Sequence, residues 1–204
     1  MKIGRLILSG ILAGGLTAGA GALAADVKPA APKADMPSNE QMMEQMMELA
    51  KPGEGHERLK PMAGTWKTSV KSWDDGPEPS VSEGECTDQW VMDGRYIKEE
   101  CTGTFAQMPF QGMGITGYDN GQKKYVSTWI DTMGTGIMMS TGTADKTGKI
   151  FTFHGMMPDP TSGKMTKVRM VTRVVDDGSH VFTMYVSMGP QGEQKMMVIT
   201  YTRK

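Results

Sequence analysis

The chain has 204 residues, of which 38% are hydrophobic and 22% are charged, and its formal net charge is −1. A chain of this length and polarity is typical of one globular domain. Its near-neutral balance argues against a nucleic-acid-binding protein that works through a basic patch, so no nucleic-acid partner is expected. Two cysteines are too few for a scaffold that is built on disulfides.

Residues 1–24 have the features of a secretory signal peptide. Lys2 and Arg5 precede an apolar stretch, and Ala22-Leu23-Ala24 fits the small-x-small cleavage pattern. The stretch is too short and too rich in glycine for a good membrane span; a retained N-terminal anchor is the alternative interpretation. We therefore expect a periplasmic or secreted protein with no membrane span after cleavage and a mature net charge of −3.

The next segments predict a linker and then a helix that is rich in methionine. Residues 25–37 are rich in Ala, Pro and Lys, a composition that is typical of an extended linker. Ser38 and Gln41 have the spacing of a capping box, and the helix should run to Ala50 within a segment that spans 38–55. Its helical spacing places four residues on one face, as expected of an amphipathic helix: Met43, Met46, Met47 and Ala50. A second short helical turn is expected over 56–62.

From residue 64 onward the hydrophobic period changes from helical to two. Turn signals recur about every ten residues, and the runs between them are rich in Val, Thr, Tyr, Phe and Met. About ten short strands in succession predict an antiparallel meander that forms a barrel or sandwich over 56–204. No stretch of helical period interrupts the strands, so parallel α/β folds are excluded.

One predicted hairpin can be placed in register from its apolar faces. A three-residue loop over 176–178, with Gly178 in the left-handed conformation, pairs Val168 with Val186 and Met170 with Met184. In this register Arg169 and Arg173 share the opposite face with Tyr185.

The two cysteines are predicted to form a disulfide. A two-residue turn at Asp93-Gly94 places Cys86 directly opposite Cys101, within the reach of a disulfide bond. Export to an oxidising compartment favours the bond, and two reduced thiols in the core are the alternative.

Motifs for cofactor and metal binding are incomplete. Residues 112–117 spell G-x-G-x-x-G, but a strand and the turn Asn120-Gly121 follow where a dinucleotide site needs a helix. Close backbone packing or strand bending explains these glycines better. His56-Glu57 opens like H-E-x-x-H, but position 60 is Lys. We therefore predict no cofactor and no metal at these motifs.

Candidate acid–base groups are also weakly supported, and no catalytic residue is predicted. The carboxylates at Glu83 with Glu85, and at Glu99 with Glu100, are more typical of solvated strand faces than of acid–base pairs. His154 and His180 have no acid and nucleophile beside them in the sequence. A hydrolase or isomerase site that assembles only in space remains an alternative.

Methionine takes over the usual place of leucine. The mature chain contains 20 Met but only Leu49 and Leu59. Most strand methionines fit core packing, for which the flexible thioether is suited. Two alternatives remain for the helix cluster at 42–47 and for His154-x-Met156-Met157, namely Cu(I) binding by soft sulfur ligands and the buffering of oxidants.

Several blocks of the sequence resemble one bacterial family, the domain-of-unknown-function 1579 family, over about residues 55–204. The central block is Gly112-x-Gly114 with Gly117-Tyr118-Asp119 and Lys124-Tyr125-Val126-x-x-Trp129-Ile130-Asp131; the others are His56-x-x-Leu59, Ala63–Trp66, Pro158–Pro160 with Gly163-Lys164, and Tyr201–Arg203. The G-x-W at 64–66 also resembles calycin (lipocalin-like) barrels, which implies a calycin-like barrel. The methionine-rich helix and the cysteine pair have no counterpart in this pattern.

These observations favour an exported, non-enzymatic barrel that binds a small apolar or amphipathic ligand. The candidate lining residues are Trp66, Trp129, Asp131, Arg169, Arg173 and Tyr185. Either face of their strands could point outward. The alternative is an envelope structural or interaction protein whose barrel is filled, with Trp66 and Trp129 as core residues. The sequence does not indicate an oligomeric state.

Overall fold

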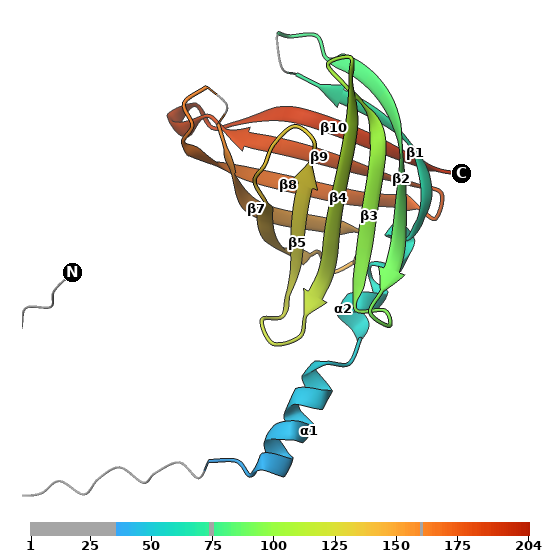
Figure 1. Cartoon of the computed structure of the whole chain (residues 1–204), viewed down its shortest axis with the longest axis vertical. Coiled ribbons are helices and arrows are strands. Elements are labelled where there is room, and N and C mark those ends of the chain that lie inside the picture. Colours follow the sequence, from blue (N-terminus) through green and yellow to red (C-terminus); the bar gives the residue numbers. More distant parts are fainter. Residues whose placement is uncertain (1–35, 74–75, 160) are drawn as a thin grey trace, which may run out of the picture. The chain divides into compact units, whose positions relative to one another are not determined.

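Ten antiparallel strands follow one another around a closed barrel in the computed structural model of this protein (Figure 1). The structure describes residues 36–73, 76–159 and 161–204. Each strand pairs with the next along the chain, and the first closes the ring by pairing with the last. The strands are β1 (Gly64–Ser72), β2 (Ser80–Val91), β3 (Tyr96–Phe105), β4 (Met108–Asp119), β5 (Lys124–Asp131), β6 (Met138–Ala144), β7 (Ile150–Pro158), β8 (Met165–Asp176), β9 (Ser179–Ser187) and β10 (Glu193–Arg203). The predicted all-β meander barrel with an N-terminal helix is confirmed.

The predicted helix is present as α1 (Asn39–Leu49). The backbone N–H of Gln41 donates to the Ser38 hydroxyl at 3.2 Å, and the backbone N–H of Ser38 donates to the Gln41 side chain at 2.8 Å. This reciprocal pair satisfies two of the amide groups that a helix start leaves without partners. The predicted signal peptide and residues 25–35 of the predicted linker lie outside the described residues.

Helix α1 has no buried residue. Its methionines Met43, Met46 and Met47 are 58%, 65% and 63% exposed. Only its C-terminal end is tied to the barrel, because Arg95 and Asn120 donate hydrogen bonds to carbonyl oxygens of residues 49–51. The methionine stripe is therefore an exposed surface in the part of the chain that the structure describes.

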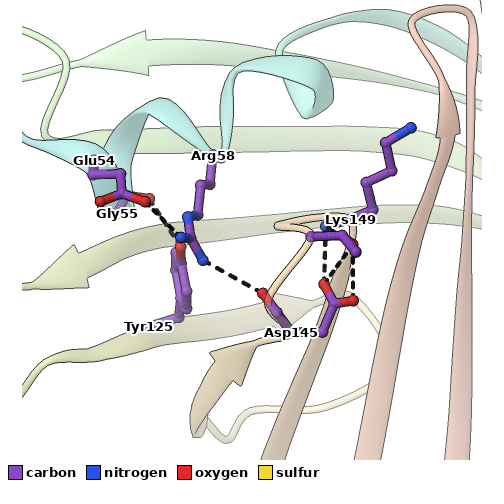
Figure 2. Close-up of polar contacts among 7 residues, drawn as sticks. Glu54, Gly55, Arg58, Tyr125, Asp145 and Lys149 are labelled. Carbon is purple, nitrogen blue, oxygen red and sulfur yellow. Dashed lines mark hydrogen bonds and ion pairs between the residues drawn. The ribbon is translucent and has the colours of Figure 1, made fainter.

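A short helical segment closes one end of the barrel. It consists of α2 (Glu54–Glu57) and the 3-10 turn η1 (Lys60–Met62), with Leu59 fully buried between them. The Tyr125 hydroxyl donates to the carbonyl oxygen of Gly55 at 3.0 Å, as Figure 2 shows. Leu59 packs in one core cluster with Tyr125 and Phe151 of the inner wall. The prediction of a helical turn over 56–62 is confirmed as these two short pieces.

Polar contacts tie the same segment to the β6–β7 loop (Figure 2). Arg58 pairs with Glu54 at 2.5 Å and donates to the backbone carbonyl of Asp145 at 3.4 Å. The Asp145 carboxylate accepts from the backbone N–H of Lys149 at 3.1 Å, which fixes the loop. These bonds hold the closing segment against the rim of the barrel.

The predicted strand registers are confirmed, with one difference in a loop. Cys86 faces Cys101 across β2 and β3, and Val168 faces Val186 across β8 and β9. In the second hairpin, however, the irregularity lies between residues 174 and 176, and Gly178 does not have a positive φ. The prediction of a left-handed Gly178 is wrong, since the extra residue is absorbed within β8 rather than in the loop.

No helix within the described ranges 36–73, 76–159 and 161–204 is long and apolar enough to cross a membrane.

Candidate functional site

Two carboxyl groups face each other on the inner wall of the barrel. Asp88 on β2 lies opposite Glu99 on β3, two residues along the ladder from the Cys86–Cys101 pair. Asp88 is only 7% exposed, and Glu99 is half-buried. Side chains alternate along a strand, so residues two positions apart lie on the same face. Because the cysteines point inward, both acids point inward as well.

Three aromatic side chains surround these acids. The Tyr201 hydroxyl, from β10, donates to Oε1 of Glu99 at 3.0 Å. His180 stacks on Tyr201 with ring centroids 4.1 Å apart, and the Trp66 ring meets His180 edge-on at 4.6 Å. Trp66 is fully buried, and its indole N–H donates to the carbonyl oxygen of Met62 at 3.0 Å. We call Asp88, Glu99, His180 and Tyr201 the inner polar cluster.

Burial shifts the protonation of this cluster toward neutral forms. It raises the pKa of Asp88 to about 9, and the charge of Glu99 adds to this shift. Burial also raises the pKa of Glu99, although the hydrogen bond from Tyr201 opposes this shift. It lowers the pKa of His180 to about 4, with Arg203 adding to the effect. At neutral pH Asp88 is therefore protonated and the imidazole of His180 is neutral, while burial favours the protonated form of Glu99.

Two atoms of the cluster have no hydrogen-bond partner among the described residues. They are Oδ1 of Asp88 and Nδ1 of His180, whose side chains are 7% and 4% exposed. Buried polar atoms are nearly always paired, because an unpaired one costs about 1–3 kcal/mol. The inner polar cluster is thus incomplete as it stands.

Beyond the cluster, toward the end away from α2, the inner wall is apolar and only half-buried. Every second side chain of β5, β6, β9 and β10 points inward here. These half-buried side chains are Trp129, Met138, Phe182, Met184, Val186, Met197 and Ile199. By contrast, Val168 and Met170 on β8 are 2% and 5% exposed. Side chains that point inward yet contact solvent indicate that solvent enters this half of the barrel.

The G-x-G of β4 makes room for Trp129. A Cβ atom on Gly112 would lie 2.3 Å from Cζ2 of this ring, and one on Gly114 would lie 3.0 Å from its Cε3. The indole N–H of Trp129 donates to Asp131 at 2.8 Å, which fixes the ring on the inner wall. These glycines allow close packing of the Trp129 ring. They do not form a dinucleotide site, because β4 leads through a turn into β5 and not into a helix.

The structure brings together only part of the predicted ligand-binding set. Trp66, Trp129 and Asp131 lie on the inner wall, with Trp129 packed against the cluster that contains Trp66. Arg169 lies opposite Tyr185 and stacks on its ring at 4.0 Å, while pairing with Glu193 at 2.6 Å.

Arg169 and its neighbours face outward. Val168 and Met170 on the same strand point into the core, so Arg169, Arg173 and Tyr185 occupy the other face of β8 and β9. The sequence left this choice of face open. These three residues do not line the interior.

The predicted disulfide is confirmed, since Cys86 and Cys101 are bonded to each other. Oε1 of Glu99 lies 3.4 Å from the sulfur of Cys101. The sulfur and carboxylate atoms of these three residues fall within 4.8 Å of one another, a spacing that suits a metal ion. In the disulfide form neither sulfur is a thiolate, so the group offers a single carboxylate donor and no metal set.

Sequence reasoning missed Asp88 and the inward direction of Glu99. The expectation that Glu99 belongs to a solvated face is wrong, because Glu99 lies inside while Glu100 points out and pairs with Lys98. The signal was available in the predicted disulfide. Residues two positions from each buried cysteine must share its face, and these are Asp88 and Glu99.

A shallow surface depression lies at the closed end. Lys60, Pro61, Asp177, Gly178 and Arg203 line it. Arg203 stacks on Trp66 at 4.2 Å and donates to three backbone carbonyls nearby. Its guanidinium therefore serves to fasten the closing segment to β10.

Comparison with known proteins identifies the family. Residues 51–203 match the family that is described as "Protein of unknown function (DUF1579)". The chain belongs to the DUF1579 family. The predicted family resemblance is thereby confirmed, and the closed barrel is consistent with a calycin-like fold. A search of curated proteins finds no match.

One solved structure supports the fold of this DUF1579 protein. The crystal structure of Rv2717c from M. tuberculosis is similar to it, with a TM-score of 0.57 and 14% identity over 76% of this chain and 99% of that chain. The structure of a redesigned β-barrel covers the same shares of the two chains at 15% identity and a TM-score of 0.39. The likeness to Rv2717c shows a shared fold and nothing more.

Proposed function

We propose that this protein is exported and holds a small apolar or amphipathic molecule inside its barrel without chemically changing it. One observation carries the proposal: an apolar inner wall that solvent reaches leads to buried polar atoms that lack partners. A molecule with an apolar body and a polar end would cover the apolar wall and form hydrogen bonds with the unpaired polar atoms. Small barrels commonly hold one such ligand.

The main alternative is a filled barrel with a purely structural role. In a filled barrel, two inward side chains that are paired on adjacent strands should be buried to a similar extent. Here Val168 is 2% exposed, whereas Val186, directly opposite on β9, is half-buried. Met170 is likewise 5% exposed, whereas Met184 opposite is half-buried. This difference favours unfilled space beside β9.

The contacts of His180 favour binding over catalysis. Its ring packs against Tyr201 and Trp66, and no hydrogen bond within the described residues joins it to a carboxylate. A general acid–base pair needs that contact or one bridging water. The inner polar cluster therefore suits recognition of a polar group.

Filling the interior tests the proposal. The full chain is titrated with N-phenyl-1-naphthylamine, a neutral amphipathic dye whose fluorescence rises in apolar surroundings. Met184→Trp adds bulk to the inner wall, and Thr183→Trp adds the same bulk on the outer face of the same strand. We expect Met184→Trp alone to abolish the fluorescence increase. Equal responses from both variants and the unchanged protein would instead support a filled barrel.

Export is tested separately by the mature N-terminus. Cleavage after Ala24 should leave Ala25 as the first residue of the protein isolated from its own cells. A mature chain that begins at Met1 and remains inside the cell would contradict export.

The exposed helix α1 favours a second candidate function. Met43, Met46 and Met47 lie at helical spacing and are more than half exposed, although methionine is normally a core residue. Clustered thioethers bind Cu(I) or consume oxidants. Native mass spectrometry after Cu(I) loading under anaerobic conditions tests metal binding, with an α1 variant that has leucine at all three positions as the control.

A further inference from the structure

The inner polar cluster contains two carboxyl groups but no cation that pairs with them among the described residues, because the imidazole of His180 is neutral and packs on Tyr201 and Trp66. The ion pairs of the described residues involve neither Asp88 nor Glu99. Within the described part of the chain, the only side-chain hydrogen bond to Glu99 from a proton-bearing group comes from the Tyr201 hydroxyl. Buried carboxyl groups are ordinarily paired with a cation or with several donors. A cation that enters the site would therefore pair with both carboxyl groups in their ionised form.

The unpaired atom of Asp88 adds a geometric requirement. Oδ1 of Asp88 is buried without a partner, on a side chain that is 93% buried and that faces Glu99. A carboxyl oxygen in this position needs an N–H or O–H donor. A group that carries both a positive charge and N–H donors satisfies Asp88 and Glu99 together, through charge-assisted hydrogen bonds.

The aromatic surroundings suit the same group. Trp66 and Tyr201 pack in one cluster beside the acids, and Trp129 packs against that cluster. Trp129 also lies in the ladder row of Glu99, separated from it only by Gly114 on β4. Cations are attracted to the faces of aromatic rings, most strongly to tryptophan. An ammonium group beside Glu99 would thus have a carboxylate and aromatic rings as its neighbours.

We propose that the barrel selects amphipathic amines, with a primary or secondary ammonium group held between Asp88 and Glu99 and the apolar tail along the half-buried inner wall. This inference rests on the proposed binding function. An anionic headgroup cannot pair with either acid once that acid is ionised, and a quaternary ammonium has no N–H for Asp88.

Binding of such an amine would release a proton. The ionisable groups that face the acids are Tyr201 from β10 and His180 from β9; Arg203 lies beyond Trp66 at the closed end. Burial raises the pKa of Asp88 to about 9 and also raises that of Glu99, so Asp88 carries a proton in the empty site at neutral pH. An ammonium ion binds the ionised form, so its affinity should rise about tenfold per pH unit between pH 6 and 8.

The experiment compares headgroups on one tail. The full chain is titrated by calorimetry with octylamine, octanol, octanoate and octyltrimethylammonium at pH 8, in two buffers that differ in ionisation enthalpy. We expect octylamine to bind about tenfold or more tightly than the other three, a ratio that a charge-assisted hydrogen bond supports. The difference between buffers should correspond to about one proton released per amine.

Two matched pairs of variants locate the selectivity. Asp88→Asn and Glu99→Gln keep the shape of the side chains and should reduce the preference for octylamine over octanol to within about twofold. Glu85→Gln and Glu100→Gln change outward acids on the same two strands and should leave that preference intact. Circular dichroism checks the fold of each variant. If Asp88→Asn does not fold, Glu99→Gln and the pH dependence of octylamine binding show whether the acids cause the preference.

The outcomes separate the two proposals. Tighter binding of octanol or octanoate than of octylamine, with Met184→Trp blocking all of them, overturns the amine inference and leaves the binding function standing. Failure of every octyl compound and of the naphthylamine dye to bind overturns both. Preference for octylamine that survives Asp88→Asn and Glu99→Gln also overturns the inference.

Discussion

The ring of Trp129 lies across Gly112 on the inner wall of the barrel, where a Cβ atom on the glycine would come within 2.3 Å of the indole. This contact explains why a cofactor-like glycine motif occurs where β4 leads through a turn into β5 and not into a helix. It also places a large aromatic surface beside the inner polar cluster.

Gly112→Ala should therefore damage both packing and binding. The added methyl group must push the Trp129 ring off the wall, and overpacking of this kind costs about 1–3 kcal/mol of unfolding free energy. Gly134→Ala is the control, because no atom lies within 4 Å of a Cβ there. Urea denaturation and dye binding measure the two effects. Equal stability of both variants would contradict the role of this contact.

Removal of the disulfide should lower stability without changing the fold. The bond joins residues that are 15 apart in the sequence, and closing a loop of that size stabilises by about 3 kcal/mol in the chain-entropy model. The double variant with Cys86→Ala and Cys101→Ala should show this loss in non-reducing urea. Dithiothreitol should destabilise the unchanged protein but not the double variant, and two free thiols in the unreduced, denatured protein would refute the bond.

The stability of the empty protein should fall as pH rises. The pKa of Asp88 is raised in the folded protein, so from about pH 4 to about pH 9 the unfolded chain releases a proton that the folded chain keeps. This costs up to about 1.4 kcal/mol per pH unit. Asp88→Asn removes the cost, so this variant should melt at a higher temperature than the unchanged protein at pH 8.5 but not at pH 4.

The matched control for that pH dependence is Asp93→Asn. The side chain of Asp93 is 99% exposed, so its substitution should leave the pH dependence of the melting temperature unchanged. If Asp88→Asn and the unchanged protein keep the same difference in melting temperature at both pH values, the buried carboxyl does not bind its proton as described.

The methionines of α1 should contribute little to the barrel. Alanine at Met43, Met46 and Met47 together removes no buried contact, so the free energy of unfolding should change by less than about 0.5 kcal/mol per site. Met170→Ala, in contrast, empties part of the core and should cost about 2–5 kcal/mol. A large loss from the α1 variant in urea denaturation would show that this helix packs on the barrel.

The sequence predicts the strands and their pairing well, because turn residues and alternating apolar side chains specify them locally. The pairing of Cys86 with Cys101 followed from one turn at Asp93-Gly94, and the capping box followed from Ser38 and Gln41. Local patterns also suffice for the short closing helices, where Pro and Gly mark the ends.

The candidate site is harder to predict, because it assembles from strands far apart in the chain. Glu99 and Tyr201 are 102 residues apart and meet only when β1 closes the ring with β10. In addition, a strand with polar residues on both faces, such as β3, has no alternating pattern that identifies its inward face. From the sequence, Arg169 and Trp129 are equally good candidates for ligand contacts, yet Arg169 points out of the barrel and Trp129 points into it.

The most direct test of the central claim, that the barrel interior holds a small molecule, is native mass spectrometry of the full chain purified without denaturation from its own cells. We predict a bound species of a few hundred daltons that is lost on denaturation and absent from the Met184→Trp variant. Detection of the bare protein mass alone, in a preparation that also fails to bind the naphthylamine dye, would contradict it.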